Sequence, residues 1–311
     1  MERIFDGQPT LAPLRGGVVA LGNFDGFHLG HQAVVGQAHA RARREGRPAL
    51  VATFDPHPAR LFRPDAAPFA LTTTAQKLDL FEAFGIDAAV VLPFDRALAA
   101  ETAEGFCRDW LAARIGAVAV VSGNDFTFGQ GRSGDVATLA ALGQAHGFAA
   151  EVVEPVSDAT APISSSRIRA LLTIGDPAGA AALLTRPYTI RARVEHGAKL
   201  GRSLGFPTAN LVLGPYLRPA YGVYAVRVRL PDGRVRDGVA NLGIRPMIEP
   251  PKELLEAWLF DFNGDLYGAE IEVALVAYLR PEAKLDGLEA LKVQVARDAE
   301  DARVALAAAP A

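Results

Sequence analysis

The hydrophobic pattern of the first 183 residues alternates between short apolar runs and longer amphipathic segments. Short runs rich in valine, alanine and leucine are typical of buried parallel strands, whereas apolar residues at helical spacing are typical of helices. The pattern predicts strands at residues 16–21, 48–54, 88–92, 118–121 and 149–153, and helices at residues 32–45, 74–84, 102–115 and 135–146. Strands that alternate with helices predict an α/β domain with a doubly wound parallel sheet, whose ligands bind at the carboxyl ends of the strands.

From about residue 188 the pattern changes to a series of strands with no helical segment between them. Strands are expected at residues 189–195, 221–230, 234–240, 255–260 and 269–278. Sequential strands joined by turns indicate an antiparallel β-barrel or a sandwich, and we expect the barrel. The last amphipathic run, residues 287–307, predicts a C-terminal helix. The change of pattern predicts two domains, residues 1–183 and 184–311.

Composition narrows the class of protein further. Half of the 311 residues are hydrophobic and 22% are charged, which is sufficient for two sizeable cores. A net charge of −3 argues against a nucleic-acid partner that needs a broad basic surface. The single cysteine, Cys107, excludes an internal disulfide, and no apolar run reaches the length of a membrane span. We therefore expect a soluble cytoplasmic protein that binds small molecules and neither nucleic acid nor membrane.

The first candidate site is the glycine-rich segment between the first long strand and its helix. Residues 21–31 read LGNFDGFHLGH, so a strand, a turn and a helix follow one another. Free backbone N–H groups and the positive end of a helix dipole favour a phosphate at such a turn. His28 and His31 alone would also fit surface residues or half of a zinc site. The dense glycines, the preceding strand and the absence of further metal-ligand residues favour phosphate binding.

This segment resembles a known signature. His28-Leu-Gly-His31 matches the HxGH motif of the nucleotidyltransferase superfamily, which implies a Rossmann-like domain of the HxGH type. Residues 22–32 are similar to the prokaryotic bifunctional riboflavin kinase/FMN adenylyltransferase (FAD synthetase) family. HxGH alone is shared by several adenylyl- and cytidylyltransferases and by some tRNA synthetases. The remaining motifs therefore decide between them.

Three further segments of the first domain match the same family. TFDPHP at residues 53–58 ends a strand, and SGNDFTFG at residues 122–129 follows another with polar and aromatic side chains suited to a planar ring. ISSSRIR at residues 163–169 places hydroxyl groups and an arginine at a helix start. Alone, these segments would also fit a plain strand exit and an ordinary helix cap.

The resemblance implies roles for individual residues. His28 and His31 would bind and polarise the ATP phosphates, and Arg167 would close on them. The nucleophile, the phosphate of FMN, is already ionised at neutral pH, so alignment and charge stabilisation suffice without a general base. The other residues implied for ATP and phosphate are Gly22, Asn23, Asp25, Ser164 and Ser165, and those for the flavin are Asp55, His57, Asn124, Asp125, Phe126 and Phe128.

The second candidate site lies in the β domain, at GRSLGFPTAN, residues 201–210. The oxygens of Thr208 and Asn210 could bind Mg²⁺, although an isolated loop of this kind would usually carry no site. The segment resembles the riboflavin kinase signature, which implies that Gly201, Thr208 and Asn210 bind Mg-ATP. The resemblance also implies that Glu256 is the general base for a ribityl hydroxyl, whose proton does not leave unaided. An outward-facing strand carboxylate is the alternative for Glu256.

Together the motifs predict an enzyme that makes FMN from riboflavin and FAD from FMN, using ATP and Mg²⁺. Met247 and Trp258 depart from the residues usual in the family, which affects the expected flavin pocket of the kinase. The alternatives are a flavin-binding carrier or sensor without turnover, and an adenylyltransferase for another phosphorylated substrate. We expect a monomer or a weak homo-oligomer.

Overall fold

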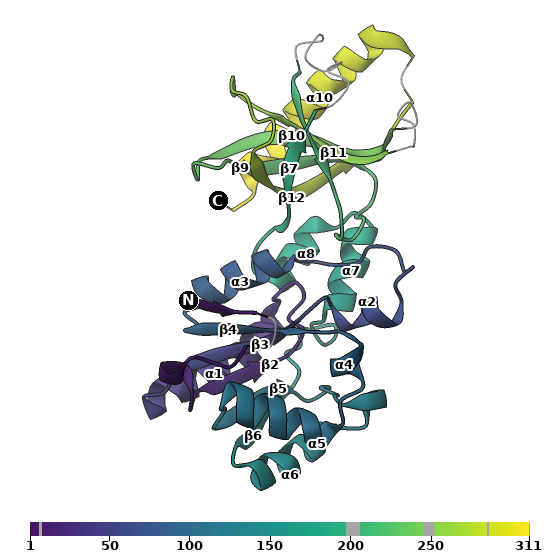
Figure 1. Ribbon diagram of the computed structural model, residues 1–311. Coiled ribbons are helices and arrows are strands. Elements are labelled where there is room, and N and C mark those ends of the chain that lie inside the picture. The colour runs from purple at the N-terminus through teal and green to yellow at the C-terminus, as the bar shows by residue number, and fades with distance from the viewer. Residues whose placement is uncertain (6–7, 197–205, 246–251, 285, 311) are drawn as a thin grey trace. The chain divides into compact units, whose positions relative to one another are not determined.

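The computed structural model describes residues 1–5, 8–196, 206–245, 252–284 and 286–310 (Figure 1). These residues form two compact units. The first contains residues 1–67 and 72–164, and the second contains residues 68–71 and 165–311.

The first unit is built on a six-stranded sheet. Its strands are β1 (Glu2–Ile4), β2 (Val18–Leu21), β3 (Ala49–Asp55), β4 (Ala88–Pro93), β5 (Ala119–Gly123) and β6 (Ala149–Val153). The order across the sheet is β1-β4-β3-β2-β5-β6, and all neighbours are parallel. This confirms the predicted doubly wound parallel sheet. The short edge strand β1 was not predicted, because three residues carry too little pattern to identify a strand.

Helices cover both faces of this sheet. They are α1 (Leu29–Glu45), α2 (Pro58–Phe62), α3 (Thr74–Ala83), α4 (Arg96–Ala99), α5 (Ala103–Gly105), the π-helix η2 (Phe106–Ile115) and α6 (Val136–His146), with short 3-10 turns η1 (Ala12–Leu14) and η3 (Gln130–Arg132). The predicted helix at 102–115 is thus formed by α5 and η2.

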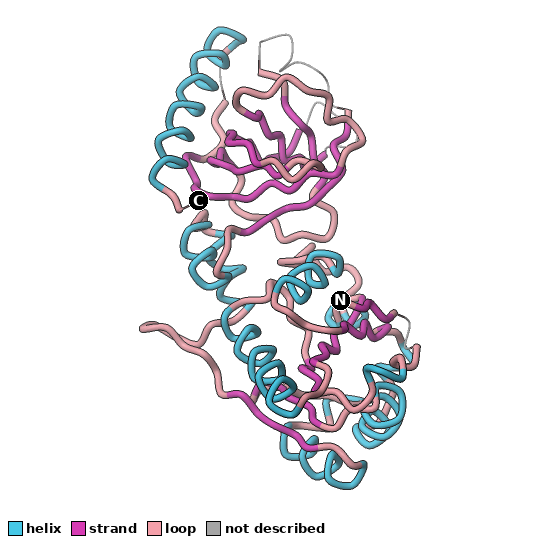
Figure 2. The backbone as a smooth tube through the Cα atoms, turned by 90° about the vertical axis from the view of Figure 1, so that its left-hand side faces the viewer, coloured by secondary structure: helices cyan, strands magenta, loops and turns pink. Residues whose placement is uncertain are grey.

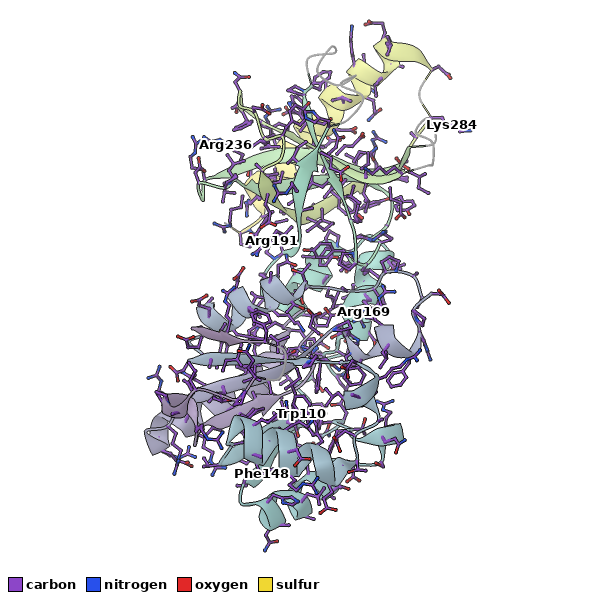
Figure 3. All side chains as sticks on the ribbon, in the orientation of Figure 1. Trp110, Phe148, Arg169, Arg191, Arg236 and Lys284 are labelled. Atoms are coloured by element: carbon purple, nitrogen blue, oxygen red, sulfur yellow. The ribbon has the colours of Figure 1, made fainter. Side chains whose placement is uncertain are left out.

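Alternate residues of the central strands enter separate cores. Val18 and Ala20 of β2 pack with apolar residues of α1 and α3, whereas Val19 and Leu21 pack with η2 and α6. Trp110 and Phe148, labelled in Figure 3, belong to the η2 and α6 side. Strands buried on both faces explain the continuous apolar runs in the sequence.

The candidate loops lie where the strand order reverses. β2 pairs with β3 on one side and with β5 on the other. The segments after β2 and β5 leave the carboxyl edge of the sheet at this switch point, the usual ligand position in such folds. Residues 22–31 follow β2, and residues 124–128 follow β5. The topology therefore brings the predicted phosphate and flavin segments to one edge.

The second unit begins with two helices and continues into a barrel. Its elements are α7 (Ser165–Thr173), α8 (Pro177–Leu184), β7 (Tyr188–Glu195), β8 (Thr208–Val212), β9 (Gly222–Arg229), β10 (Val235–Arg245), β11 (Lys252–Leu259), β12 (Glu270–Arg280) and α10 (Gly287–Ala308). The strands close in the order β10-β11-β8-β7-β12-β9 with antiparallel neighbours. This confirms the barrel and rules out the sandwich.

The terminal helix α10 packs on the outside of β9, β10 and β12 (Figure 2). Ala299, Ala302 and Leu306 supply its buried face. This confirms the predicted helix. The strand β8 was predicted as part of a loop, which is wrong: it pairs with both β7 and β11. Its five residues follow a glycine- and proline-rich segment and are not strongly apolar, so their pattern did not identify a strand.

The second unit also includes segments outside the barrel. Helices α7 and α8 pack on each other, and α8 contacts β7 and β12, so both belong to the unit of the barrel. Arg169 on α7, labelled in Figure 3, donates to the Phe69 carbonyl at 2.8 Å, which holds residues 68–71 in the same unit. Within the described part of the chain, no helix combines the length and apolar character needed to cross a membrane.

Candidate active sites

His28 begins α1 and contacts His31 directly. The Nδ1 atom of His28 accepts a hydrogen bond from the backbone N–H of His31 at 3.4 Å, so its side chain caps the helix. The two imidazole rings stack with centroids 3.6 Å apart and planes 20° apart. His28 is only 5% exposed. The two predicted histidines therefore form a stacked pair at a helix N-terminus, where the helix dipole favours an anion.

The β2–α1 turn (residues 22–28) has an uncommon backbone. Phe24 and Phe27 have φ of 51° and 46°, a region that bulky residues rarely adopt. The ring of Phe24 meets the His31 ring edge-on at 5.4 Å. A Cβ atom at Gly22 would lie 3.0 Å from the Phe24 ring, so glycine leaves room for this packing. The turn thus holds His31 between Phe24 and His28.

Two polar residues of the β2–α1 turn have different environments. The carboxylate of Asp25 is buried and accepts bonds from the Thr72 N–H at 3.0 Å and hydroxyl at 3.3 Å. The Oδ1 atom of Asn23 is buried and has no hydrogen-bond partner among the described residues. An unpaired buried acceptor is costly, which makes Asn23 a suitable ligand-binding group. That Asp25 binds ATP stays a prediction.

Ile163, which precedes the serine segment and belongs to the first unit, lies close to the same helix start. The Ile163 carbonyl lies 3.4 Å from the position of a Cβ on Gly30. Ser164 follows as the last residue of the first unit, and Ser165 begins α7 in the second. Arg167 lies in the first turn of α7. The predicted phosphate residues are therefore divided between the two units.

The predicted flavin residues end β3 and β5. The Asp55 carboxylate is exposed, and the Nδ1 atom of His57 caps α2 by accepting from the Ala59 N–H at 3.1 Å. Past β5, Asn124 donates through Nδ2 to Glu154 at 3.2 Å, and Asp125 is exposed.

The two predicted flavin aromatics stack on each other. The rings of Phe126 and Phe128 are 5.7 Å apart with planes at 14°. Phe128 is 8% exposed and packs against Phe106, whereas Phe126 is half-buried. Phe126 is therefore the more accessible of the two.

The barrel candidates share one face of neighbouring strands. Asn210 of β8 lies directly opposite Glu256 of β11, and Thr208 lies opposite Trp258. Since side chains of directly opposed residues point to the same side of a sheet, all four share a face. Asn210 is 6% exposed and Glu256 is half-buried. The predicted base and the predicted Mg²⁺ ligands are thus brought together.

Asn210, Glu256 and Asn241 form a row of polar residues across three neighbouring strands, and Asn241 was not predicted as a site residue. Asn241 of β10 lies opposite Glu256 on the other side of β11, and its Nδ2 donates to Glu282 at 3.2 Å. Its Oδ1 atom is buried without a partner among the described residues. Only the strand register reveals the row, because Asn210, Asn241 and Glu256 are far apart in sequence. Gly201 and Met247 fall outside the described residues.

The donor set of this row fits Mg²⁺. A hydroxyl, an amide oxygen and one carboxylate are hard oxygen donors, and Mg²⁺ is usually held by one or two carboxylates together with substrate phosphates. The described residues include no group of three or more histidine, cysteine or acidic side chains arranged to bind a metal. A site completed by nucleotide phosphates agrees with both observations.

Comparison with known proteins assigns both halves of the chain. Residues 11–167 match the family model described as FAD synthetase, and residues 184–306 match the one described as riboflavin kinase. The bifunctional riboflavin kinase/FMN adenylyltransferase of Escherichia coli (strain K12) is 39% identical over 292 residues, covering 94% of this chain and 93% of that protein. The chain belongs to this family. A Bacillus subtilis (strain 168) relative with the same description is 37% identical over 291 residues, 92% of this chain and 91% of its own.

A solved structure from Streptococcus pneumoniae, described as a macrolide-efflux protein, has a fold similar to that of this chain. It has a TM-score of 0.86 and 30% identity, covering 97% of this chain and 99% of that one. Within the bifunctional family, the chain has an FAD synthetase region that contains the histidine pair and Arg167, and a riboflavin kinase region that contains Asn210 and Glu256. It is therefore an enzyme of flavin synthesis with ATP and flavins as substrates.

Proposed function

We propose that residues 1–183 form the adenylyltransferase domain and residues 184–311 the riboflavin kinase domain. The first transfers AMP from ATP to FMN: a phosphate oxygen of FMN bonds to the α-phosphorus, and pyrophosphate leaves. The second transfers the γ-phosphoryl group of ATP to a ribityl hydroxyl of riboflavin, and ADP leaves. The stacked histidines at the start of α1, at the switch point of the sheet, carry the first assignment most directly.

In the adenylyltransferase site, the chain aligns two anions. His28 and His31 bind the ATP phosphates at the start of α1, and the unpaired Oδ1 of Asn23 is available to the nucleotide. Ser164, Ser165 and Arg167 close on the β- and γ-phosphates. Preorganised donors of this kind stabilise the charge that develops during transfer by about 3–4 kcal/mol each. Gly22 and Asp25, in the same turn, line the ATP phosphates.

The flavin of the adenylyltransferase lies at the ends of β3 and β5, the two strands that flank β2. Asp55 and His57 at the β3 exit (residues 54–57), and Asn124 and Asp125 after β5, supply polar groups around it. Phe126 and Phe128, whose rings stack on each other, bind the isoalloxazine, and the half-buried Phe126 offers the more accessible ring face.

In the kinase site, Glu256 is the general base. It accepts the proton of the ribityl hydroxyl as the oxygen bonds to the γ-phosphorus. Its position opposite Asn210 supports this role, because the base must lie beside the bound phosphates. Thr208 and Asn210 hold Mg²⁺ together with the β- and γ-phosphates, and Gly201 lines the ATP phosphates. When bound, Mg²⁺ would neutralise phosphate charge and make the γ-phosphorus easier to attack.

We further propose that the protein works in the cytoplasm on small molecules, as a monomer or a weak homo-oligomer. The net charge of −3 and the absence of a broad basic composition support small-molecule rather than nucleic-acid partners.

The direct test is a product assay. Purified protein incubated with riboflavin, ATP and Mg²⁺ is expected to form FMN first and then FAD, separated by chromatography. Omission of Mg²⁺, with a chelator present, is expected to stop FMN formation. Failure to form either flavin nucleotide would contradict the proposed function, and FMN without FAD would contradict the role of the first domain.

A further inference from the structure

Lys77 lies buried beneath the adenylyltransferase loops and has no role in the assignments above. It occupies the first turn of α3, whose start is fixed by a capping box between Thr73 and Gln76. Its side chain is 5% exposed. Lys77 is also the only lysine among the first 198 residues, although that region is rich in arginine. A compact ammonium group with three donors is therefore used here in place of the planar guanidinium.

The ammonium group bonds to two segments that carry predicted site residues. It donates to the Asn23 carbonyl at 3.2 Å, in the β2–α1 turn. It also donates to the Thr53 hydroxyl at 3.1 Å and to the Phe54 carbonyl at 3.2 Å, at the end of β3. The Thr53 hydroxyl in turn donates to the Asn23 carbonyl at 3.1 Å. Three acceptors thus use all three protons of the ammonium group.

A second contact from the same region supports this arrangement. Thr72, five residues before Lys77, accepts from the Gly26 N–H at 3.0 Å and donates to Asp25. The start of α3 and the residues before it therefore bond the β2–α1 turn at two points. Asp25 in the turn and Asp55 at the β3 exit are the charged groups that face the ammonium.

We propose that Lys77 is a positioning residue for adenylyl transfer to FMN. Its ammonium group bonds the turn before His28 to the strand end before His57, and so fixes the phosphate and flavin segments against each other. The geometry within the first unit carries this inference, which rests on the proposed assignment of that unit to adenylyl transfer. Burial supports it, since it lowers the pKa of Lys77 to about 8 despite Asp25 and Asp55. A buried titratable group whose pKa is strongly shifted is typical of functional sites.

The test compares FAD formation from FMN and ATP between pH 7 and 10 in wild type, Lys77→Met and the control Lys292→Met. Lys292 lies on α10 with its side chain 42% exposed and far from both predicted sites in the sequence. We expect Lys77→Met to lower kcat/KM about tenfold or more at pH 7, because small misplacements of reacting groups are costly. Wild-type FAD formation should fall above pH 8, because a neutral amine can donate to only two acceptors. The Lys77→Met profile should lack this decline.

Riboflavin phosphorylation by the same samples is the internal control, and it should be equal in all three proteins. A folded Lys77→Met that forms FAD at the wild-type rate, or with the wild-type pH profile, would overturn the proposal. If wild type itself forms no FAD, the assignment of the domain fails instead, which is a separate result.

Circular dichroism shows whether Lys77→Met folds. If it does not fold, a second variant, Thr53→Val, tests the proposal. Thr53→Val keeps the shape and the ammonium group but removes the hydroxyl that accepts from Lys77 and donates to the Asn23 carbonyl. We expect FAD formation to fall about threefold or more, the value of one or two hydrogen bonds. The alkaline decline should also shift in pH. An unchanged rate and profile in this variant would likewise overturn the proposal.

Discussion

At the residue scale, specific partners hold the side chains of the proposed adenylyltransferase site in place. His28 caps its own helix and stacks on His31, so its ring is fixed before any ligand binds. Asn23 presents its backbone carbonyl to Lys77, and its buried side-chain oxygen finds no partner in the part of the chain that the structure describes. Preorganised groups of this kind are the usual source of electrostatic stabilisation in transfer reactions.

The buried ammonium of Lys77 makes stability depend on pH in a defined direction. Its folded-state pKa of about 8 lies below the unfolded value of about 10.4. Between these values the unfolded chain binds more protons, so the folded state gains stability as pH rises. We expect the free energy of unfolding of wild type, relative to Lys77→Met, to rise by about 3 kcal/mol from pH 8 to 10.5.

Denaturant unfolding of both proteins at each pH measures this difference. The expected rise in stability runs opposite to the expected fall in FAD formation. A fall in wild-type FAD formation above pH 8 can then be attributed to lost positioning, because the Lys77 contribution to stability rises over the same pH range. A difference between the two proteins that stays constant from pH 8 to 10.5 would contradict the burial of a charged Lys77.

The sequence revealed some of these residues and concealed others for physical reasons. His28 and Glu256 stand in local motifs, so their neighbourhood in the chain identified them. Lys77 lies in an amphipathic helix, where a lysine is usually exposed. Asn241 joins Glu256 only through strand register. Contacts between residues far apart in sequence leave no local pattern, so packing alone reveals them.

At the element scale, the alternation of apolar and polar residues predicted most strands and the long helices. It failed where tertiary pairing determines the conformation, as in β8, which is stabilised by neighbours on both sides. It also gave no sign that the helix after α5 winds as a π-helix. Residues 53–58 and 122–129 were predicted as site segments because parallel strands place their exits at one edge and because both segments match the family.

Closure of the barrel depends on a glycine at the start of β9. Gly222 has φ of 151°, and a Cβ there would lie 2.3 Å from the Arg280 carbonyl and 2.7 Å from the Tyr278 ring. We expect Gly222→Ala to destabilise the second unit by about 2–4 kcal/mol, because both backbone and packing must shift.

The matched control is Gly233→Ala, with φ of 84° and no atom within 4 Å of the added Cβ. Its cost should be about 1 kcal/mol, from backbone strain alone. Thermal unfolding of the three proteins, followed by circular dichroism, gives the comparison. Equal destabilisation by the two substitutions would show that close packing at Gly222 does not matter.

At the scale of the whole molecule, one chain carries two phosphate-transfer chemistries on two folds. The FMN phosphate needs only alignment, which suits the proposed first site of imidazoles, hydroxyls and helix N-termini. The ribityl hydroxyl needs a base, which suits the proposed role of Glu256 beside Asn210 in the second site. The two units have separate hydrophobic cores. We therefore expect substitutions in one site to leave the other reaction intact.

The most direct test is a crossed product assay of wild type, His28→Asn and Glu256→Gln, with Glu270→Gln as an exposed glutamate control on β12. Asparagine keeps a cap on α1, so His28→Asn removes the imidazole without removing the cap. Glu256→Gln should lower FMN formation about 100-fold or more and leave FMN-to-FAD conversion unchanged. His28→Asn should lower FAD formation by about 100-fold and leave FMN formation unchanged. Equal loss of both reactions in either variant would contradict two separate sites.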